Sequence, residues 1–131
     1  MNAEIIIANM LAHTAITALV GNRRALGLLP QNSPLPAVVY QLIDSVPTPS
    51  VSLSSARLAR ARVQINPLAK TIGEVKAIHH AVRSALDHKH QIVVAGKTVV
   101  SCTLDSFGPV DNDFDSSTWT QPADYLLVYY E

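Results

Sequence analysis

Four histidines lie close together and are the first residues whose type could support chemistry: His79, His80, His88 and His90. A metal site on a helix needs two histidines on one face, three or four positions apart. His79 and His80 are adjacent, so they point about 100° apart on a helix, and His88 and His90 follow its expected end. Cationic side chains at that end complement the helix dipole. The histidines therefore predict core and helix-capping roles and no metal site.

Three aspartates at alternate positions, Asp111, Asp113 and Asp115, have the spacing that begins a calcium-binding loop. The rest of that pattern is missing, because Ser116 stands where the loop needs glycine and Pro122 where it needs a bidentate acid. A solvated or partner-facing acidic loop is the preferred interpretation.

Catalytic signatures are also missing from the sequence. It contains no G-x-S-x-G, H-E-x-x-H, phosphate-binding loop or dinucleotide-binding motif. The single cysteine, Cys102, alternates with Val100 and Leu104, which predicts a buried side chain in a strand. We therefore expect no cofactor and no enzyme activity. The enzymatic alternative pairs His79 or His80 with an acid, and it requires a pocket that holds the pair within hydrogen-bond reach.

Arginines mark one strand of the expected sheet. Arg60 and Arg62 project from its polar face, with Arg57 at its start. Arginine is enriched at protein interfaces because its planar fork binds carboxylates in pairs. Together with the acidic loop, these residues predict a candidate contact between copies of the chain; the alternative is a solvated face.

The composition indicates one domain, spanning residues 1–131, that hides part of its surface against partners. The chain is 48% hydrophobic and 15% charged, with zero formal net charge. So few charges favour an oligomer. A nucleic-acid-binding domain carries a basic excess, so direct or sequence-specific nucleic-acid binding is not expected.

Targeting signals are not expected either. Residues 1–10 contain Glu4 and no basic residue, which differs from a signal peptide. No run of about 18 apolar residues is present, as a membrane span would need. We expect a soluble protein made inside the cell, with no membrane partner.

The hydrophobic periodicity predicts helices and strands in separate runs. In chain order it favours a helix over 2–13, a short turn over 14–19, strands over 37–45 and 57–66, a helix over 71–87, a hairpin over 91–94 and 97–104, a polar loop over 105–121 and a strand over 123–130. Thr71 and Glu74 form a capping box, and Pro67 is expected to end its strand. The strand over 37–45 is apolar on both faces, which predicts cover on both sides. This order predicts an α+β fold, with a mostly antiparallel sheet packed against one long helix and a short N-terminal helix.

Four segments in this order resemble the bacteriophage tail-completion family, relatives of tail-terminator and head-tail joining proteins. They are residues 16–21 (ITALVG), the loop 30–36 running into the strand 37–40 (AVVY), the strand 60–65 (RARVQI) followed by the capped helix 71–86, and the aromatic strand 124–130 (DYLLVYY). The resemblance covers nearly the whole chain.

The resemblance implies a structural tail protein of a phage or prophage. Such subunits form a ring, commonly a hexamer, that caps the tail tube and joins it to the head. The implied partners are further copies of the chain, the tail tube protein, and a head connector or neck protein. The implied location is the virion tail, assembled in the cytoplasm of the bacterial host. An α+β adaptor or binding domain of unrelated function is the alternative.

Two loops are the candidate docking devices in this interpretation. The first, over 46–55, contains Pro47 and Pro49. The second, over 105–121, contains Phe107, Phe114 and Trp119. Loops that order on binding suit such contacts.

Overall fold

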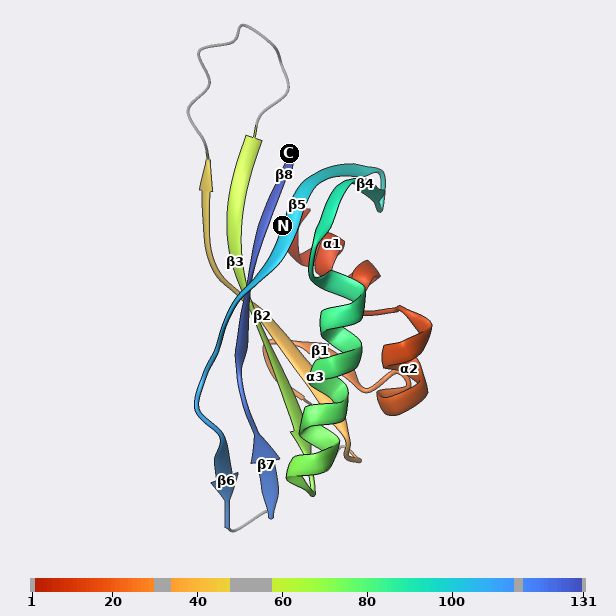
Figure 1. The fold of residues 1–131 in the computed structure, drawn as a ribbon, viewed down its shortest axis with the longest axis vertical. Coiled ribbons are helices and arrows are strands. Elements are labelled where there is room, and N and C mark those ends of the chain that lie inside the picture. The colour runs from red at the N-terminus through yellow and green to blue at the C-terminus, as the bar shows by residue number, and fades with distance from the viewer. Residues whose placement is uncertain (1, 30–33, 48–57, 115–116, 131) are drawn as a thin grey trace, which may run out of the picture.

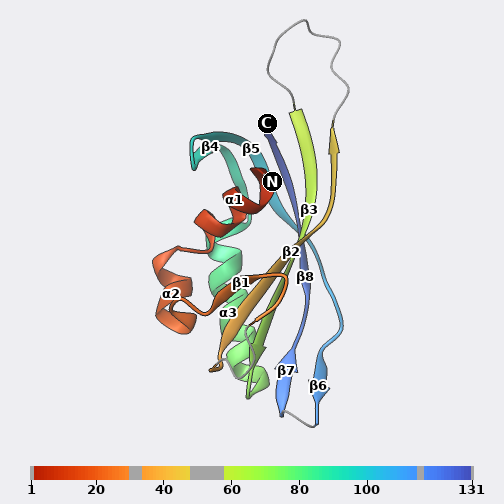
Figure 2. The same ribbon diagram turned by 180° about the vertical axis from the view of Figure 1, so that it is seen from behind.

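The computed structural model describes residues 2–29, 34–47, 58–114 and 117–130, and Figure 1 shows its layers. The helices gather on one face of a long, twisted sheet, and the view from behind shows the same separation (Figure 2). The elements are α1 (Asn2–Met10), α2 (Thr14–Val20), β1 (Arg24–Leu26), β2 (Ala37–Pro47), β3 (Leu58–Ala69), α3 (Ile72–Leu86), β4 (Lys89–Val94), β5 (Lys97–Phe107), β6 (Asp111–Asp113), β7 (Thr118–Thr120) and β8 (Ala123–Tyr130).

The strand order confirms the α+β class and the mostly antiparallel sheet. The main path runs β1-β2-β3-β8-β5-β4, and β7 joins the far end of β3 with β6 beside it. Within the described residues the β1–β2 pair alone is parallel. The prediction of one long helix with a short N-terminal helix is incomplete, because the described residues hold three helices, of 9, 7 and 15 residues.

The longest helix, α3, forms because its sequence supplies both a cap and an apolar stripe. The Thr71 hydroxyl accepts a hydrogen bond from the Glu74 amide at 3.2 Å, as the capping box predicts. Ile78, Val82 and Leu86 recur at helical spacing and are buried against the sheet.

The opposite side of the core comes from β3 and β8, which alternate between buried and half-exposed residues. Tyr125, Leu127 and Tyr129 of β8 face the helices and are buried, and the predicted strand over 123–130 is confirmed. The Ala95–Gly96 turn joins β4 to β5 with positive φ at both residues, 52° and 76°, as a tight hairpin requires.

The strand β3 continues past Pro67, contrary to the sequence-based expectation. Its pairing with β8 stops at Ile65, opposite Ala123, and its pairing with β7 begins at Leu68, opposite Thr120. Pro67 lies in this interruption, so neither neighbouring strand on that side needs the amide hydrogen that proline lacks. One strand therefore spans the long axis of the sheet.

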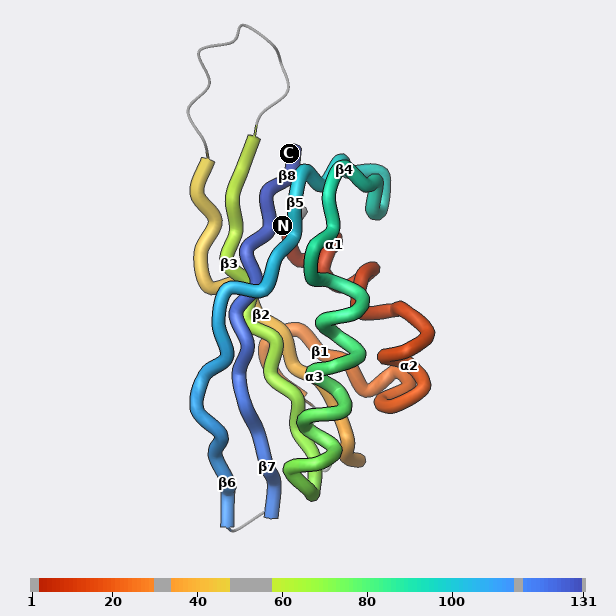
Figure 3. Tube along the Cα trace, in the orientation of Figure 1, coloured from red at the N-terminus to blue at the C-terminus, as the bar shows by residue number. Residues whose placement is uncertain are grey.

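The prediction of a polar loop over 105–121 is also wrong. The strand β5 runs on to Phe107, and β6 pairs with β7 to form a short hairpin. We call residues 108–121 the arm. It extends from the end of the sheet opposite to the one where β2 ends and β3 begins (Figure 3).

The strand β2 is covered less than its sequence suggested. β1 pairs with it only from Val38 to Tyr40, and in the described parts of the chain no other strand borders this edge. Ile43 and Val46 follow in the uncovered half and are exposed by 46% and 47%. Because these side chains are exposed, the prediction that both faces of this strand are covered is wrong for its second half within one chain.

Among the described residues, no single helix has the length and apolar composition of a membrane span. The helices α1 and α2 pass that test only as a pair, and they are bent by 78° relative to each other.

Candidate functional site

The base of the arm is tied to helix α3 by one residue, Gln121, which is buried. Its side-chain amide donates to the Gly108 carbonyl at 3.0 Å and accepts from the Lys76 ammonium at 2.7 Å. Its main-chain carbonyl lies 2.7 Å from Nε2 of His79. Gln121 thus bonds three residues, Lys76 and His79 of the helix and Gly108 of the arm, and so fixes the start of the arm.

This packing leaves no room for a side chain at position 108, which is a glycine. Its amide donates to the Pro122 carbonyl at 2.7 Å, closing the base of the arm. A Cβ at this position would lie 2.7 Å from Cγ of the Pro122 ring. Any larger residue would therefore push the two strands of the base apart.

A pocket of about 250 Å³ opens beside this base. Its walls are Lys76, His79, His80, Arg83, Phe107 and Gln121. A second hollow of about 290 Å³ shares His80 and Arg83 and continues along the exposed side of α3. The pocket is cationic on its helix side and aromatic on its strand side, a combination that suits an anionic group beside an apolar one.

The histidine inside this pocket resists protonation in the folded chain. Because Nε2 of His79 faces a carbonyl oxygen, it carries the proton and donates the hydrogen bond. Burial lowers the pKa of His79; the bond to the Gln121 carbonyl opposes this shift, and the nearby Lys76 charge adds to it. The Phe107 ring packs edge-on against His79, with centroids 5.1 Å apart. His79 is therefore a core residue, one of the two roles predicted for the histidines.

Acidification is expected to destabilise the chain through His79. The unfolded chain takes up the proton near pH 6.5 whereas the folded chain resists it. The contribution of unprotonated His79 to the free energy of unfolding is therefore complete above that pH and is lost as the pH falls below it. His79→Gln should flatten the decline in unfolding free energy between about pH 7.5 and about pH 5.5, by up to about 1.4 kcal/mol per pH unit. Urea unfolding at several pH values measures this. The exposed His80→Gln is the control; equal pH profiles for His79→Gln and the unsubstituted chain would contradict the assignment.

A carboxylate closes the other end of α3. Asp87 accepts hydrogen bonds from the amides of Leu104 and His88, at 2.8 Å and 3.0 Å, and from Nε of Arg83 at 3.0 Å. Burial alone would raise the pKa of Asp87, but these donors outweigh it and hold the pKa below its usual value. The carboxylate thereby joins the helix to β5.

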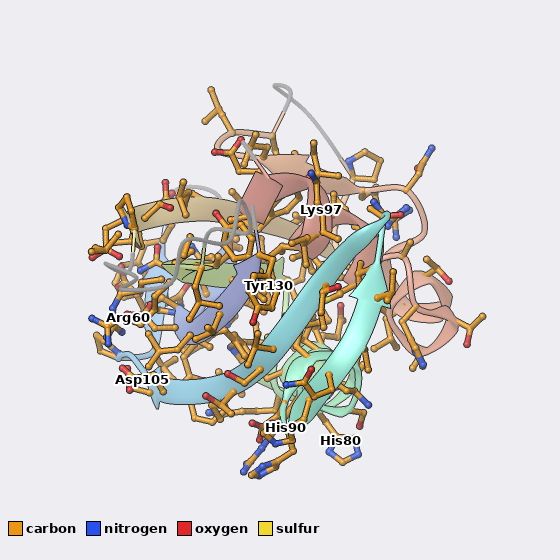
Figure 4. The ribbon with its side chains drawn as sticks, turned by 90° about the horizontal axis from the view of Figure 1, so that it is seen from above. Arg60, His80, His90, Lys97, Asp105 and Tyr130 are labelled. Atoms are coloured by element: carbon orange, nitrogen blue, oxygen red, sulfur yellow. The ribbon has the colours of Figure 1, made fainter. Side chains whose placement is uncertain are left out.

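The predicted arginine strand is partly occupied within the chain. Arg62 binds Asp105 of β5 at 2.7 Å and Asp124 of β8 at 3.2 Å, so this ion triad crosses three neighbouring strands. Arg60 is exposed on the same face, and Arg57 lies outside the described residues. Arg60 and Asp105 lie away from α3, beside which His80 projects (Figure 4).

The predicted acidic partner lies far from these arginines in the same chain. Asp111 and Asp113 are exposed on β6, in the arm, and Asp115 lies outside the described residues. Since Arg60 is near the β2–β3 end, the structure does not bring the two predicted halves together within one chain. A contact between the arginines of one copy and the acidic arm of another copy stays a prediction.

The predicted docking residues divide between the two ends of the sheet. Pro47 is exposed at the end of β2, and Pro49 lies outside the described residues. At the other end Phe107 is 43% exposed and Phe114 is 87% exposed. Trp119 is half-buried because its strand, β7, pairs with both β6 and β3.

Sequence reasoning missed the cationic lining of the pocket. Lys76, His80 and Arg83 recur at intervals of four and three, so they share the solvent face of α3. That spacing was visible in the sequence, but the aromatic wall was not, because Phe107 reaches the helix only through the sheet.

Metal and thiol chemistry find no support among the described residues. No group of three or more His, Cys, Asp or Glu side chains there could hold a metal ion. Cys102 is buried, and burial raises the pKa of its thiol to about 12. Such a thiol is a poor nucleophile.

Comparison with known proteins identifies the family. A chain in the virion of a native gene transfer agent particle has a similar fold, with TM-score 0.68 and 16% identity over 98% of this chain and 97% of that chain. A second solved structure has TM-score 0.59 and 14% identity over 99% and 90%. At these identities the likeness shows the fold alone.

No curated protein matches the chain. The family model described as "Tail completion protein gp17" matches residues 4–116, which confirms the resemblance found in the sequence. Because this match runs from the first helix into the arm, the chain belongs to the tail-completion protein family.

Proposed function

We propose that the chain is a structural, non-catalytic subunit that caps the tail tube of a phage-like virion and joins it to the head. Copies close a ring on the head-proximal end of the tube, stop its growth and present a surface to the head connector or neck. Membership of the tail-completion family supports a place in the virion tail. A similar fold occurs in the virion of a gene transfer agent particle.

The observation that carries the proposal is the distribution of exposed apolar side chains. Among the exposed apolar residues, Ile43 and Val46 belong to β2, towards one end of the long sheet, and Val110 and Phe114 belong to the arm at the other end, while others, such as Leu28 and Val93, lie elsewhere on the chain (Figure 1). Exposed apolar groups mark protein contacts. A subunit with contacts at opposite ends suits a joint between two partners.

Lateral contacts would close the ring. In a ring of more than two copies each copy meets its two neighbours through different surfaces, and such head-to-tail contacts form a ring when the rotation closes. The resemblance implies six copies.

The test compares particles assembled with and without the chain. We expect headless tails of irregular length when the chain is absent, and complete particles when it is supplied separately; electron microscopy counts both. Light scattering on the assembled chain should give a mass near six times 14.1 kDa. Complete particles in its absence would contradict the proposal and favour an adaptor of unrelated function.

A further inference from the structure

We propose that the cationic pocket on α3 binds the arm of a neighbouring copy, through its exposed residues Asp111, Asp113 and Phe114. This inference rests on the proposed function, which brings copies side by side in a ring. It names the occupant of the pocket: an acidic, aromatic segment of a second copy of the same chain.

The charges of the two surfaces are complementary. The helix side of the pocket carries the charged side chains Lys76 and Arg83, the latter paired with Asp87, beside the imidazole of His80, while Asp111 and Asp113 are exposed on the arm. The Lys76 ammonium bonds the neutral amide of Gln121, so a carboxylate would add an ionic partner to it. Opposite charges across an interface guide association and fix its register.

The arginine strand is partly occupied by carboxylates of its own chain. Arg62 is held by Asp105 and Asp124. Of the arginines expected to bind the acidic loop, Arg62 therefore already has carboxylate partners. The cationic helix side of the pocket is a second surface that the acidic arm of another copy can bind.

Apolar complementarity supports the same pairing. The Phe114 side chain is 87% exposed, and Phe107, which lines the pocket, is 43% exposed. Aromatic rings pair favourably edge to face, as Phe107 and His79 already do. Covering both phenylalanines would supply the aromatic anchor that protein interfaces commonly use.

The arm cannot fill the pocket of its own chain. Its base is held by the Gly108–Pro122 hydrogen bond and by pairing of Leu68 and Ala69 with β7. The Thr120 hydroxyl also bonds Asn66. Because the strands of the hairpin are extended, Phe114 lies beyond that base along the arm. The pocket lies at the base, so only another copy can insert its tip.

A contact between tip and pocket joins two different surfaces. Each copy therefore offers one tip and one pocket, and the contact propagates from copy to copy until the ring closes. Although the chain has zero net charge, its acidic arm and its cationic pocket would then meet at each contact of the assembly.

Charge exchange tests the contact. The pocket variant carries Lys76→Glu and His80→Glu, and the tip variant carries Asp111→Lys and Asp113→Lys. Both leave the Arg83–Asp87 pair intact. Each variant alone places like charges at every contact, and we expect its loading onto isolated tails to fall roughly tenfold or more. The readout is the number of copies bound per tail.

Two restored combinations keep the test specific. A chain with all four substitutions has opposite charges at every contact, and so does an equal mixture of the two variants when copies alternate. Both should regain loading near that of the unsubstituted chain. Circular dichroism checks that each variant folds. Normal loading of both separate variants, or failure of both combinations although the folded variants are present, would overturn the inference.

The outcome also separates this inference from the proposed function. If the unsubstituted chain does not load onto tails, the proposed function itself is wrong. If the unsubstituted chain loads and completes particles but the charges have no effect, the copies meet elsewhere and the function stands.

Discussion

Replacing Ile43 and Val46 of β2 with lysine is expected to leave the chain folded and to prevent the joining of tails to heads. Both side chains are about half exposed on the uncovered half of β2, and Ile43 is the extra residue of a bulge between Leu42 and Asp44. An apolar anchor at an interface contributes about 2 kcal/mol, or about 30-fold in affinity. The effect multiplies when several copies bind together, so the yield of complete particles should fall by far more.

The control for this experiment adds two lysines elsewhere. Ala15→Lys and Ala18→Lys place the same charges on exposed positions of α2. Electron microscopy counts complete particles, and thermal unfolding checks stability. An equal yield from the β2 variant and the control would mean that the β2–β3 end contacts no partner.

Shortening Leu127 to alanine is expected to give the largest loss of stability. Leu127 is fully buried in β8, between β3 and β5, and pairs with Ala61 and Cys102. Removing its side chain forfeits transfer free energy and leaves a cavity, at a cost of about 2–5 kcal/mol. Since domains are stable by only about 5–15 kcal/mol, the midpoint of urea unfolding should fall sharply.

The matched control for this change lies next to it in the chain. Leu126 is half-buried on the opposite face of β8, so Leu126→Ala should cost clearly less than Leu127→Ala. Equal losses for the two variants would contradict the assignment of the helix-covered face as the core.

Features with strong local signals were predictable from the sequence. The cap at Thr71, the stripe of α3 and the alternation of β8 each depend on neighbouring residues, and each was confirmed. The β4–β5 hairpin also follows from its Ala95–Gly96 turn.

Features fixed by distant contacts were not predictable. The strand β1 has three residues, and its partner β2 begins eleven positions after it ends. The strands β6 and β7 are polar, so their alternation carries no apolar signal; they form because β3 extends beyond β8 and offers Leu68 and Ala69 for pairing. The pocket could not be predicted for the same reason, since its aromatic wall depends on these pairings.

The length of β3 has a mechanical consequence. This strand runs from the β2–β3 end to the base of the arm and is bonded to β2 and β8, and at its far end to β7. Ladder hydrogen bonds lie across the strands, so tension along the long axis would load many of them in shear at once. A pull across the sheet would instead break them one after another. A joint built from such subunits should be stiff along its axis and yield first at the short β7 contact, where two ladder pairs and the Thr120–Asn66 hydrogen bond join the described part of the arm to β3.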